Sequence, residues 1–358
     1  MKKQIIMFPI IFLSLIGCIP EPKILEDIQL VQSVGYDLKE KDEYIGTAGS
    51  SFVPPGENAS PTDVTLTAEG KTVKQMRQRM QALSAKPIEI GRLGIVIFSQ
   101  EVAEAGIQPF IDNYERDPNI GRDIHLVVSK DKASDIIQTN YVESEDVSQY
   151  IIDVIHQNIE RTLPRMNLHH YLFQYYAEGY DPFMPMISKS GNQLEVIGVA
   201  LFNGDKYIDT IPFDESYIFK ILYEKASKGQ FEMDYEEDES ISVQNIVSNT
   251  KYKIERKRGE YKAHFTINFN GKVSESGGLD LTDKKNIKKV EKALEKEISA
   301  RALTLIDKFK TLEVDPLGLG DKARQKGIYN KEEWEKQYPN LPVTIETKIH
   351  VVQSGIAE

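Results

Sequence analysis

The first eighteen residues constrain this chain more than any other stretch. Two lysines at positions 2 and 3 form a short basic start, an apolar run over residues 5–16 follows, and Gly17 then precedes Cys18, the one cysteine in the sequence. A basic start, a short apolar core and a small residue before the cut are the parts of a secretory signal peptide. The apolar run is shorter than the ~20 residues of a transmembrane helix. We therefore expect residues 1–17 to be removed before the chain folds.

The four residues Leu15-Ile16-Gly17-Cys18 resemble the bacterial lipoprotein signal, in which the cysteine sulfur receives a diacylglyceryl group and becomes the new N-terminus. An ordinary signal peptide with a chance cysteine is the alternative, and the absence of any other cysteine favours lipidation. Two acyl chains anchor a protein stably, whereas one binds only marginally. We expect Cys18 to hold the protein at the outer face of a cytoplasmic membrane, with no later stretch able to span it.

Composition narrows the possible functions. The chain has 358 residues, 40% of them hydrophobic, which suffices for more than one core. Loss of two lysines with the leader lowers the formal net charge from −11 to −13. Such a charge disfavours binding of nucleic acid and offers no electrostatic attraction to anionic lipid. With Cys18 lipidated no thiol remains, which excludes disulfides, cysteine metal sites and a cysteine nucleophile.

The residues after the leader predict strands and helices in alternation. Residues 18–27 contain two prolines and read as a tether between the lipid and the first domain. Apolar runs at 28–36 and 44–53 predict a hairpin, residues 54–61 a polar loop, and helical spacing with a capping pair predicts a helix over 73–84. Further strands are expected at 64–68, 93–98 and 124–128, and further helices at 107–114, 133–138, 147–159 and 168–175.

Later residues predict two domain boundaries. Pro182 and Pro185 interrupt the pattern, and the acidic run 234–239 reads as a solvated linker. We therefore expect an N-terminal α/β domain over 28–182, a small middle domain over 183–234 and a C-terminal α+β domain over 235–358. Within them the sequence predicts tight turns at Asn203-Gly204 and Asn270-Gly271, a helix with Tyr217, Ile218, Ile221 and Leu222 on one face, a long helix over 281–312 and a final strand over 343–351.

No catalytic or metal-binding pattern emerges from the sequence. The six histidines lack the spacing of a metal site, and His264 and His350 fall on the polar faces of alternating strands. The stretch Gly318-x-Gly320-x-x-Ala323 partly matches a dinucleotide fingerprint, but it follows a helix instead of a strand, so a chain-reversing glycine loop is the better interpretation. The aromatic cluster at 171–180 is expected mainly in the core, with a remainder available as a contact surface. We expect no cofactor and no metal.

Three groups of residues, taken in order, resemble the Ger(x)C family, the lipoprotein C-subunits of bacterial spore germinant receptors. The resemblance runs over nearly the whole chain and depends on the ordered set. Two positions depart from the family pattern, since Ile19-Pro20 follows the cysteine in place of Trp-Asp and Leu319 replaces a phenylalanine. The first group is Val34-Gly35-Tyr36-Asp37; the second is Arg116-Asp117-Pro118, Arg122, the strand 124–128 and Ala133-Ser134-Asp135-Ile136-Ile137; the third is Asp315-Pro316-Leu317-Gly318-Leu319-Gly320, Trp334, the strand 343–352 and Gly355.

The resemblance implies an α+β fold of three successive domains, each a mainly antiparallel or mixed sheet packed with helices. It also implies a protein that is not an enzyme and that works with two membrane-embedded partners, an A-subunit and a B-subunit, at the inner membrane of the spore. The complex would respond to nutrients and start germination. Structural or interface roles are implied for the motif positions, which are Gly35, Asp37, Arg116, Arg122, Asp315, Gly318, Gly320 and Trp334.

Three functions are compared on these grounds. The first is a lipid-anchored, non-catalytic receptor subunit that acts by assembly with its partners; direct nutrient binding by this subunit is supported by no residue set. The second is a lipid-anchored solute-binding protein that delivers a small molecule to a transporter, against which the antiparallel strand pattern of the last section counts. The third, an envelope hydrolase, ranks last because no pair of carboxylates is distinguished by the sequence.

Overall fold

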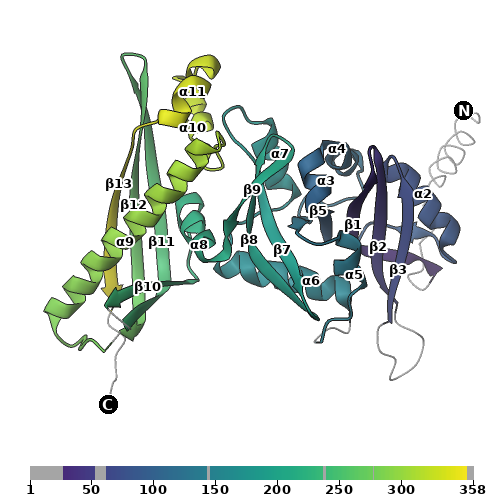
Figure 1. Cartoon of the computed structure of the whole chain (residues 1–358), viewed down its shortest axis with the longest axis horizontal. Coiled ribbons are helices and arrows are strands. Elements are labelled where there is room, and N and C mark those ends of the chain that lie inside the picture. Colours follow the sequence, from purple (N-terminus) through teal and green to yellow (C-terminus); the bar gives the residue numbers. More distant parts are fainter. Residues whose placement is uncertain (1–26, 53–61, 143–145, 237–238, 277, 353–358) are drawn as a thin grey trace, which may run out of the picture.

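The computed structural model describes residues 27–52, 62–142, 146–236, 239–276 and 278–352, and its strands form two sheets (Figure 1). The expected leader, Cys18 and all but the last residue of the expected tether lie outside the described residues, as does the whole of the expected loop at 54–61. Figure 1 shows an elongated molecule with the four-stranded sheet at one end and the strands β1–β3 towards the other.

The larger sheet has nine strands in the order β3-β2-β1-β5-β6-β7-β8-β9, with the short β4 paired to the start of β1. The neighbours β1, β5, β6 and β7 run parallel, and the outer pairs are antiparallel hairpin partners. Its strands are β1 (Gln29–Glu40), β2 (Glu43–Phe52), β3 (Thr62–Gly70), β4 (Ile88–Glu89), β5 (Ile95–Ser99), β6 (His125–Ser129), β7 (Phe183–Ser190), β8 (Gln193–Asn203) and β9 (Lys206–Pro212).

Helices cover both faces of this sheet. In β2, Gly46 faces Met76 of α2, whereas Gly49 faces Ile137 of α5 and Ser148 of α6. All five residues of β5 are buried, as expected of a continuous apolar strand between two helical layers. The helices are α2 (Val73–Leu83), α3 (Gln100–Ala105), α4 (Gln108–Arg116), α5 (Ala133–Gln138), α6 (Val147–Arg161) and α7 (Leu168–Tyr176).

The smaller sheet has the order β10-β11-β12-β13, with β12 and β13 parallel. Alternate residues of β12 are buried, and the long helix α9 contacts the sheet through a stripe that runs from Val290 to Phe309. The elements are β10 (Gln230–Glu236), β11 (Glu239–Lys257), β12 (Glu260–Ser276), α9 (Lys284–Thr311), α10 (Leu319–Gln325), α11 (Lys331–Gln337), the 3-10 turn η2 (Tyr338–Asn340) and β13 (Val343–Val352).

Helix α8 (Phe213–Tyr223) joins the two sheets. Its Phe219 is fully buried, with its ring centre 4.8 Å from that of Phe183 on β7 and 5.5 Å from that of Phe309 on α9. Thr250 of β11 donates a hydrogen bond of 2.6 Å to the carbonyl of Ile221. One helix therefore packs against both halves of the chain, which explains why seven consecutive residues of it, 216–222, are buried.

The α+β class with mixed sheets is confirmed, but the three-domain division is not. The boundary expected at Pro182 does not separate two sheets, because β7 pairs with β6 on one side and β8 on the other. The segment 183–234 has no sheet of its own. The acidic run is not a linker, since Asp234 pairs with Ser240 in the β10–β11 hairpin. The turn at Asn203-Gly204 is confirmed with a shift of one residue, since Asn203 pairs with Lys206.

One further expectation about the C-terminal part is wrong, and the expected final strand is present as β13. Asn270-Gly271 is not a turn, because both residues lie inside β12 and pair with β11. Gly271 is there because a side chain would collide with Val243 and Phe269 on the buried face, not because the chain reverses. The final strand is parallel to β12, and the crossover through α9, α10 and α11 supplies the long connection that parallel pairing requires.

Gly271→Ala is expected to destabilise the protein by about 1–3 kcal/mol, because its methyl group enters a filled space beneath β12. Gly91→Ala is the matched control, since a methyl group there meets no atom within 4 Å and should change the free energy of unfolding by less than about 0.5 kcal/mol. Urea denaturation measures both. Equal effects of the two substitutions would contradict the packing argument.

Candidate functional site

The first motif group and part of the second form one joint between β1 and α5. The Asp37 carboxylate, 2% exposed, accepts hydrogen bonds from the backbone N–H groups of Ala133 (2.6 Å) and Ser134 (2.9 Å). These are the first residues of α5, whose N–H groups have no partner within the helix. A methyl group on Gly35 would lie 2.8 Å from the Cβ of Ala133. Gly35 thus lets the helix approach the strand, and Asp37 caps it.

The third group forms a second joint, against the segment 179–181 that leads into β7. Two hydrogen bonds join Asp181 and Asp315. The Asp315 N–H donates to the Asp181 carboxylate at 2.7 Å, and the Asp181 N–H donates to the Asp315 carbonyl at 3.1 Å. The Asp321 N–H donates to the Gly179 carbonyl at 3.0 Å. A Cβ on Gly320 would lie 2.8 Å from the Gly179 Cα, so the two backbones meet only because both residues are glycine.

Asp315 is the most perturbed acid of this joint. Its side chain is buried, one oxygen accepts from the Gly320 N–H at 2.7 Å, and the other accepts no hydrogen bond from the described part of the chain. Burial raises the pKa of Asp315 from 3.8 to about 7, with a smaller contribution from the nearby Asp181, while the surrounding N–H groups oppose the rise. Burial also raises the pKa of Asp181. The tyrosines Tyr252 and Tyr338 hold the same loop through hydrogen bonds to the carbonyls of Leu317 and Val314.

Neither Arg116 nor Arg122 forms an ion pair with Asp37 or Asp315 in the described part of the chain. The Arg116 side chain is 77% exposed and pairs with Asp112 one turn earlier in α4. Arg122 contributes its carbonyl, which accepts from the His169 N–H at the start of α7 at 2.9 Å, while Tyr176 at the end of α7 donates to Glu115 beside Arg116. Helix α7 therefore connects the second motif group with the 179–181 segment.

Trp334 is a core residue of the C-terminal part. It is 3% exposed, and its ring lies edge-on to Tyr261 at 5.1 Å and tilted against Tyr338 at 5.5 Å. Its Nε1 lies 2.8 Å from where a Cβ on Gly320 would be, so the indole also closes the space around the second joint. Gly318 is the N-cap of α10, has φ +65° and lies against Tyr180, so the expected glycine turn is confirmed at this residue. Gly320 and Ala323 lie inside α10 and not in a loop.

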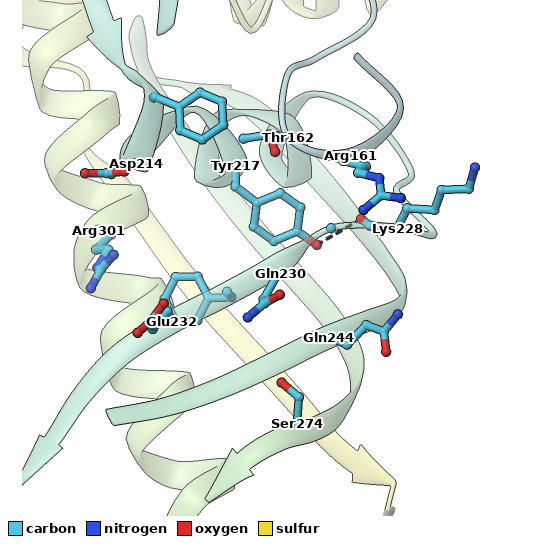
Figure 2. Close-up of a pocket in the computed structure, with 13 residues that line it drawn as sticks. Arg161, Thr162, Asp214, Tyr217, Lys228, Gln230, Glu232, Gln244, Ser274 and Arg301 are labelled. Carbon is cyan, nitrogen blue, oxygen red and sulfur yellow. Dashed lines mark hydrogen bonds between the residues drawn. The ribbon is translucent and has the colours of Figure 1, made fainter. Parts of the chain in front are cut away.

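A hollow with a volume of about 1000 Å³ lies between the end of α6, α8 and the smaller sheet. Figure 2 shows it lined by side chains from α6, α8, β10, β11 and α9. Three cations and two carboxylates face it, namely Arg161, Lys228, Arg301, Asp214 and Glu232. It is an open and polar groove, and none of the motif positions lines it.

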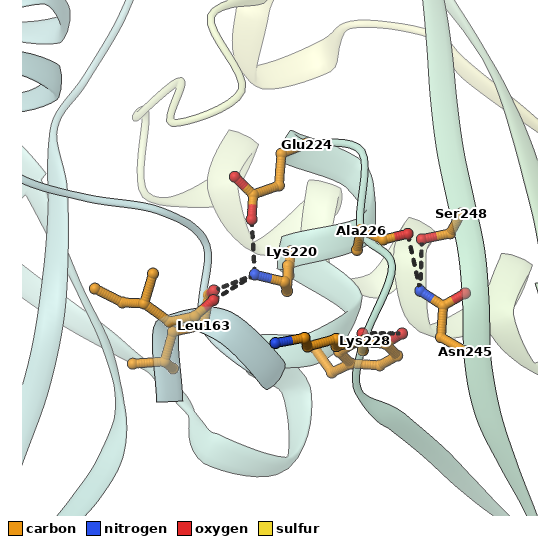
Figure 3. A network of polar contacts seen from close by, with 9 residues as sticks. Leu163, Lys220, Glu224, Ala226, Lys228, Asn245 and Ser248 are labelled. Atoms are coloured by element: carbon orange, nitrogen blue, oxygen red, sulfur yellow. Dashed lines mark hydrogen bonds and ion pairs between the residues drawn. The ribbon is translucent and has the colours of Figure 1, made fainter. Parts of the chain in front are cut away.

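A buried lysine, Lys220 of α8, lines a second hollow (Figure 3). The Lys220 ammonium, 3% exposed, donates to the carbonyls of Ile159 (2.6 Å) and Leu163 (2.8 Å) at the end of α6 and to the carboxylate of Glu224 (2.7 Å). Burial lowers its pKa. All three donors are used, so the lysine caps a helix C-terminus and is not a free nucleophile.

The described residues contain no group of three histidines, cysteines or acids placed to hold a metal ion. His264 and His350 are exposed, as their strand positions predicted. Of the aromatic cluster, Tyr171 is buried and Tyr175 and Tyr180 are partly buried, whereas Phe173 and Tyr176 are more than half exposed. Less of the cluster lies in the core than the sequence predicted. No helix within the described ranges is long and apolar enough to cross a membrane.

Two family models match regions of the chain that contain the residues of both joints. A family model described as "Spore germination protein N-terminal domain" matches residues 21–189, and one described as "Spore germination B3/GerAC like, C-terminal" matches residues 197–355. The chain belongs to the Ger(x)C family of germinant receptor C-subunits. The two matches divide a Ger(x)C chain near β7 and β8, and they span the first, second and third motif groups.

Individual relatives extend over the full length. Spore germination protein GerQC of Bacillus cereus is 32% identical over 362 residues, which cover 99% of this chain and 100% of that protein. Spore germination protein A3 of Bacillus subtilis is 27% identical over 77% of this chain and 74% of its own. The crystal structure of the GerBC protein matches the fold with a TM-score of 0.61 at 13% identity, covering 89% of this chain and 96% of that one.

Several residues of the joints were not anticipated from the sequence. Gly179 and Asp181 precede a proline and read only as a boundary, and nothing in their spacing pointed to residues 315–321. Lys220 offered a signal, since a charged residue stands inside the apolar run that contains Phe219 and Ile221. A buried charge of that kind requires partners.

Asp315→Asn is expected to remove a pH dependence of stability. The unfolded carboxyl titrates near 3.8 and the folded one near 7, so between these values only the folded state keeps the proton. The stability from this group is fully present below about pH 4 and is lost as the pH rises through 7, by at most roughly 4 kcal/mol. Urea unfolding at about pH 5 and about pH 8 measures the difference. If the variant showed the same pH dependence as the wild type, Asp315 would not be the titrating group.

Proposed function

We propose that this chain is a lipid-anchored, non-catalytic subunit of a nutrient-sensing germinant receptor that triggers spore germination. The supporting observation is family similarity that spans residues 21–189 and 197–355 and begins three residues after a lipidation signal ending in Cys18. The diacylglyceryl group on Cys18 holds the protein at the outer face of the cytoplasmic membrane, which in the spore is the inner membrane.

The subunit acts by assembly with the membrane-embedded A and B subunits. Confinement to a thin layer above the bilayer raises the effective concentration of such partners without any new contact. The fold suits this role, because α8 and the 315–321 loop keep the two sheets in one arrangement and so present a fixed surface to a partner.

A non-catalytic role agrees with the structural contacts that the buried charged side chains make. In the described part of the chain four charged side chains are buried: Asp37, Lys220, Asp315 and Asp321. Asp37 and Lys220 cap helices, Asp315 holds the second joint, and Asp321 pairs with Arg324. Each therefore has a structural partner.

The second function left open by the sequence is delivery of a solute to a transporter. It has less support than the role of receptor subunit. Family membership favours germination, and the four-stranded sheet with one helical layer is unlike a second α/β lobe that closes on a ligand.

Cys18→Ala is expected to leave the fold unchanged and to move the protein from the membrane fraction to the soluble fraction, because the acyl chains supply the stable attachment. Fractionation of cells in high salt, with immunodetection, measures this. If the variant still sedimented with membranes in high salt, the lipid on Cys18 would not be the anchor.

Deletion of the gene is expected to abolish the germination response to one class of nutrient while other responses persist. Dipicolinic acid release from spores, across a panel of single nutrients, measures the response. In a strain that lacks all other receptors of this family, restoring the gene together with its A and B partners should restore that response. Failure to do so would favour the solute-binding function.

A further inference from the structure

Helix α2 and its flanking segments carry concentrated positive charge in a chain whose formal net charge is −11. Residues 71–92 contain a single acid, Glu89, and the helix itself contains none. Met76 and Met80 bury the opposite face against β2 and β3. The cations of the segment are Lys71, Lys74, Arg77, Arg79, Lys86 and Arg92.

Most of this charge is exposed and uncompensated. Lys71, Lys74, Arg79 and Arg92 are exposed, and none has a carboxylate within 4.0 Å in the described part of the chain. The neighbouring acids are already engaged, since Asp117 pairs with Arg77 at 3.6 Å and Glu69 pairs with Lys39 at 2.6 Å. A positive surface therefore persists on this side of an acidic protein.

The position of α2 connects this surface to the membrane. The chain enters the fold beside the end of the helix, because the Gln29 N–H donates to the Pro87 carbonyl at 2.8 Å and β4 pairs with the start of β1. Asp27 follows Cys18 by nine residues, which span at most about 30 Å when extended. The 11 residues of α2 extend about 16 Å. The whole helix thus lies within reach of the surface at which Cys18 would be anchored.

We propose that the exposed cations of α2 and its flanking segments, Lys71, Lys74, Arg79 and Arg92, dock on the anionic phospholipid headgroups of the membrane that holds the lipid anchor. The orientation of this contact rests on the proposed anchor at Cys18. The anchor limits how far the protein can lie from the membrane but does not fix which side of it faces the membrane. The cations fix that side, because each strengthens binding near an anionic surface by about fivefold. The four-stranded sheet, at the other end of the molecule in Figure 1, then points away from the bilayer.

A second group of exposed lysines serves as the comparison. Lys285, Lys288 and Lys289 lie in the first turns of α9. They stand among acids of the same helix and its cap, including Asp283 and Glu291, and they belong to the sheet that lies far from the start of β1 (Figure 1). The position of the tether and the pattern of charges therefore both favour the cations of α2, and not those of α9, as the membrane contact.

The test uses residues 18–358 with Cys18→Ala, which keep every described residue and lack lipid and leader. Sedimentation with vesicles compares phosphatidylcholine alone with an equal mixture of phosphatidylcholine and phosphatidylglycerol, at low and high salt. The test variant carries Lys71→Gln, Lys74→Gln and Arg92→Gln, whose side chains make no hydrogen bond or ion pair in the described part of the chain. The control carries Lys285→Gln, Lys288→Gln and Lys289→Gln, the same change in charge.

We expect binding only to the anionic vesicles, lost at high salt, weakened at least about tenfold by the α2 substitutions and less than about twofold by the α9 substitutions. Thermal unfolding should show both variants folded. Equal binding to both vesicle types, no binding to either, or an equal loss in the α9 control would overturn the proposal. Because the assay lacks the lipid, its failure is distinct from a failure of Cys18 to anchor the protein, which cell fractionation reports.

Discussion

The arrangement of the two sheets depends on a close approach of two backbones. Gly179 and Gly320 meet where any side chain would intrude, and the hydrogen bonds that Asp181, Asp315 and Asp321 make across this contact join β7's entry segment to the start of α10. Helix α8 adds an apolar connection through Phe219, buried between Phe183 and Phe309. The two contacts together hold one half of the chain against the other.

The motif residues serve mainly these internal contacts. Gly35 and Asp37 dock and cap α5, Asp315 and Gly320 form the second joint, and Trp334 packs behind it. A receptor subunit that works by assembly needs rigid relative positions of its parts more than a reactive centre. The surfaces that meet partners or membrane must then be sought among residues outside the motifs, such as the cations of α2.

Net charge is a poor guide to such surfaces. A formal charge of −13 after loss of the leader indicated no attraction to anionic lipid, yet residues 71–92 bring six cations to one helix and its flanks, and the neighbouring acids Glu69 and Asp117 are already paired. Local charge decides interactions within about 10 Å, because salt screens the remainder of the molecule.

The sequence by itself determined the elements whose signals are local. Apolar spacing and the capping residue Thr72 predicted α2, and uninterrupted apolar residues predicted the buried strand β5. Tertiary structure alone decided which strands share a sheet, so it overturned the turn at Asn270-Gly271, paired the acidic run and brought Gly179 to Gly320. The reason is physical: periodicity records which face of an element is buried, whereas glycines and buried charges such as Lys220 depend on a neighbour distant in the chain.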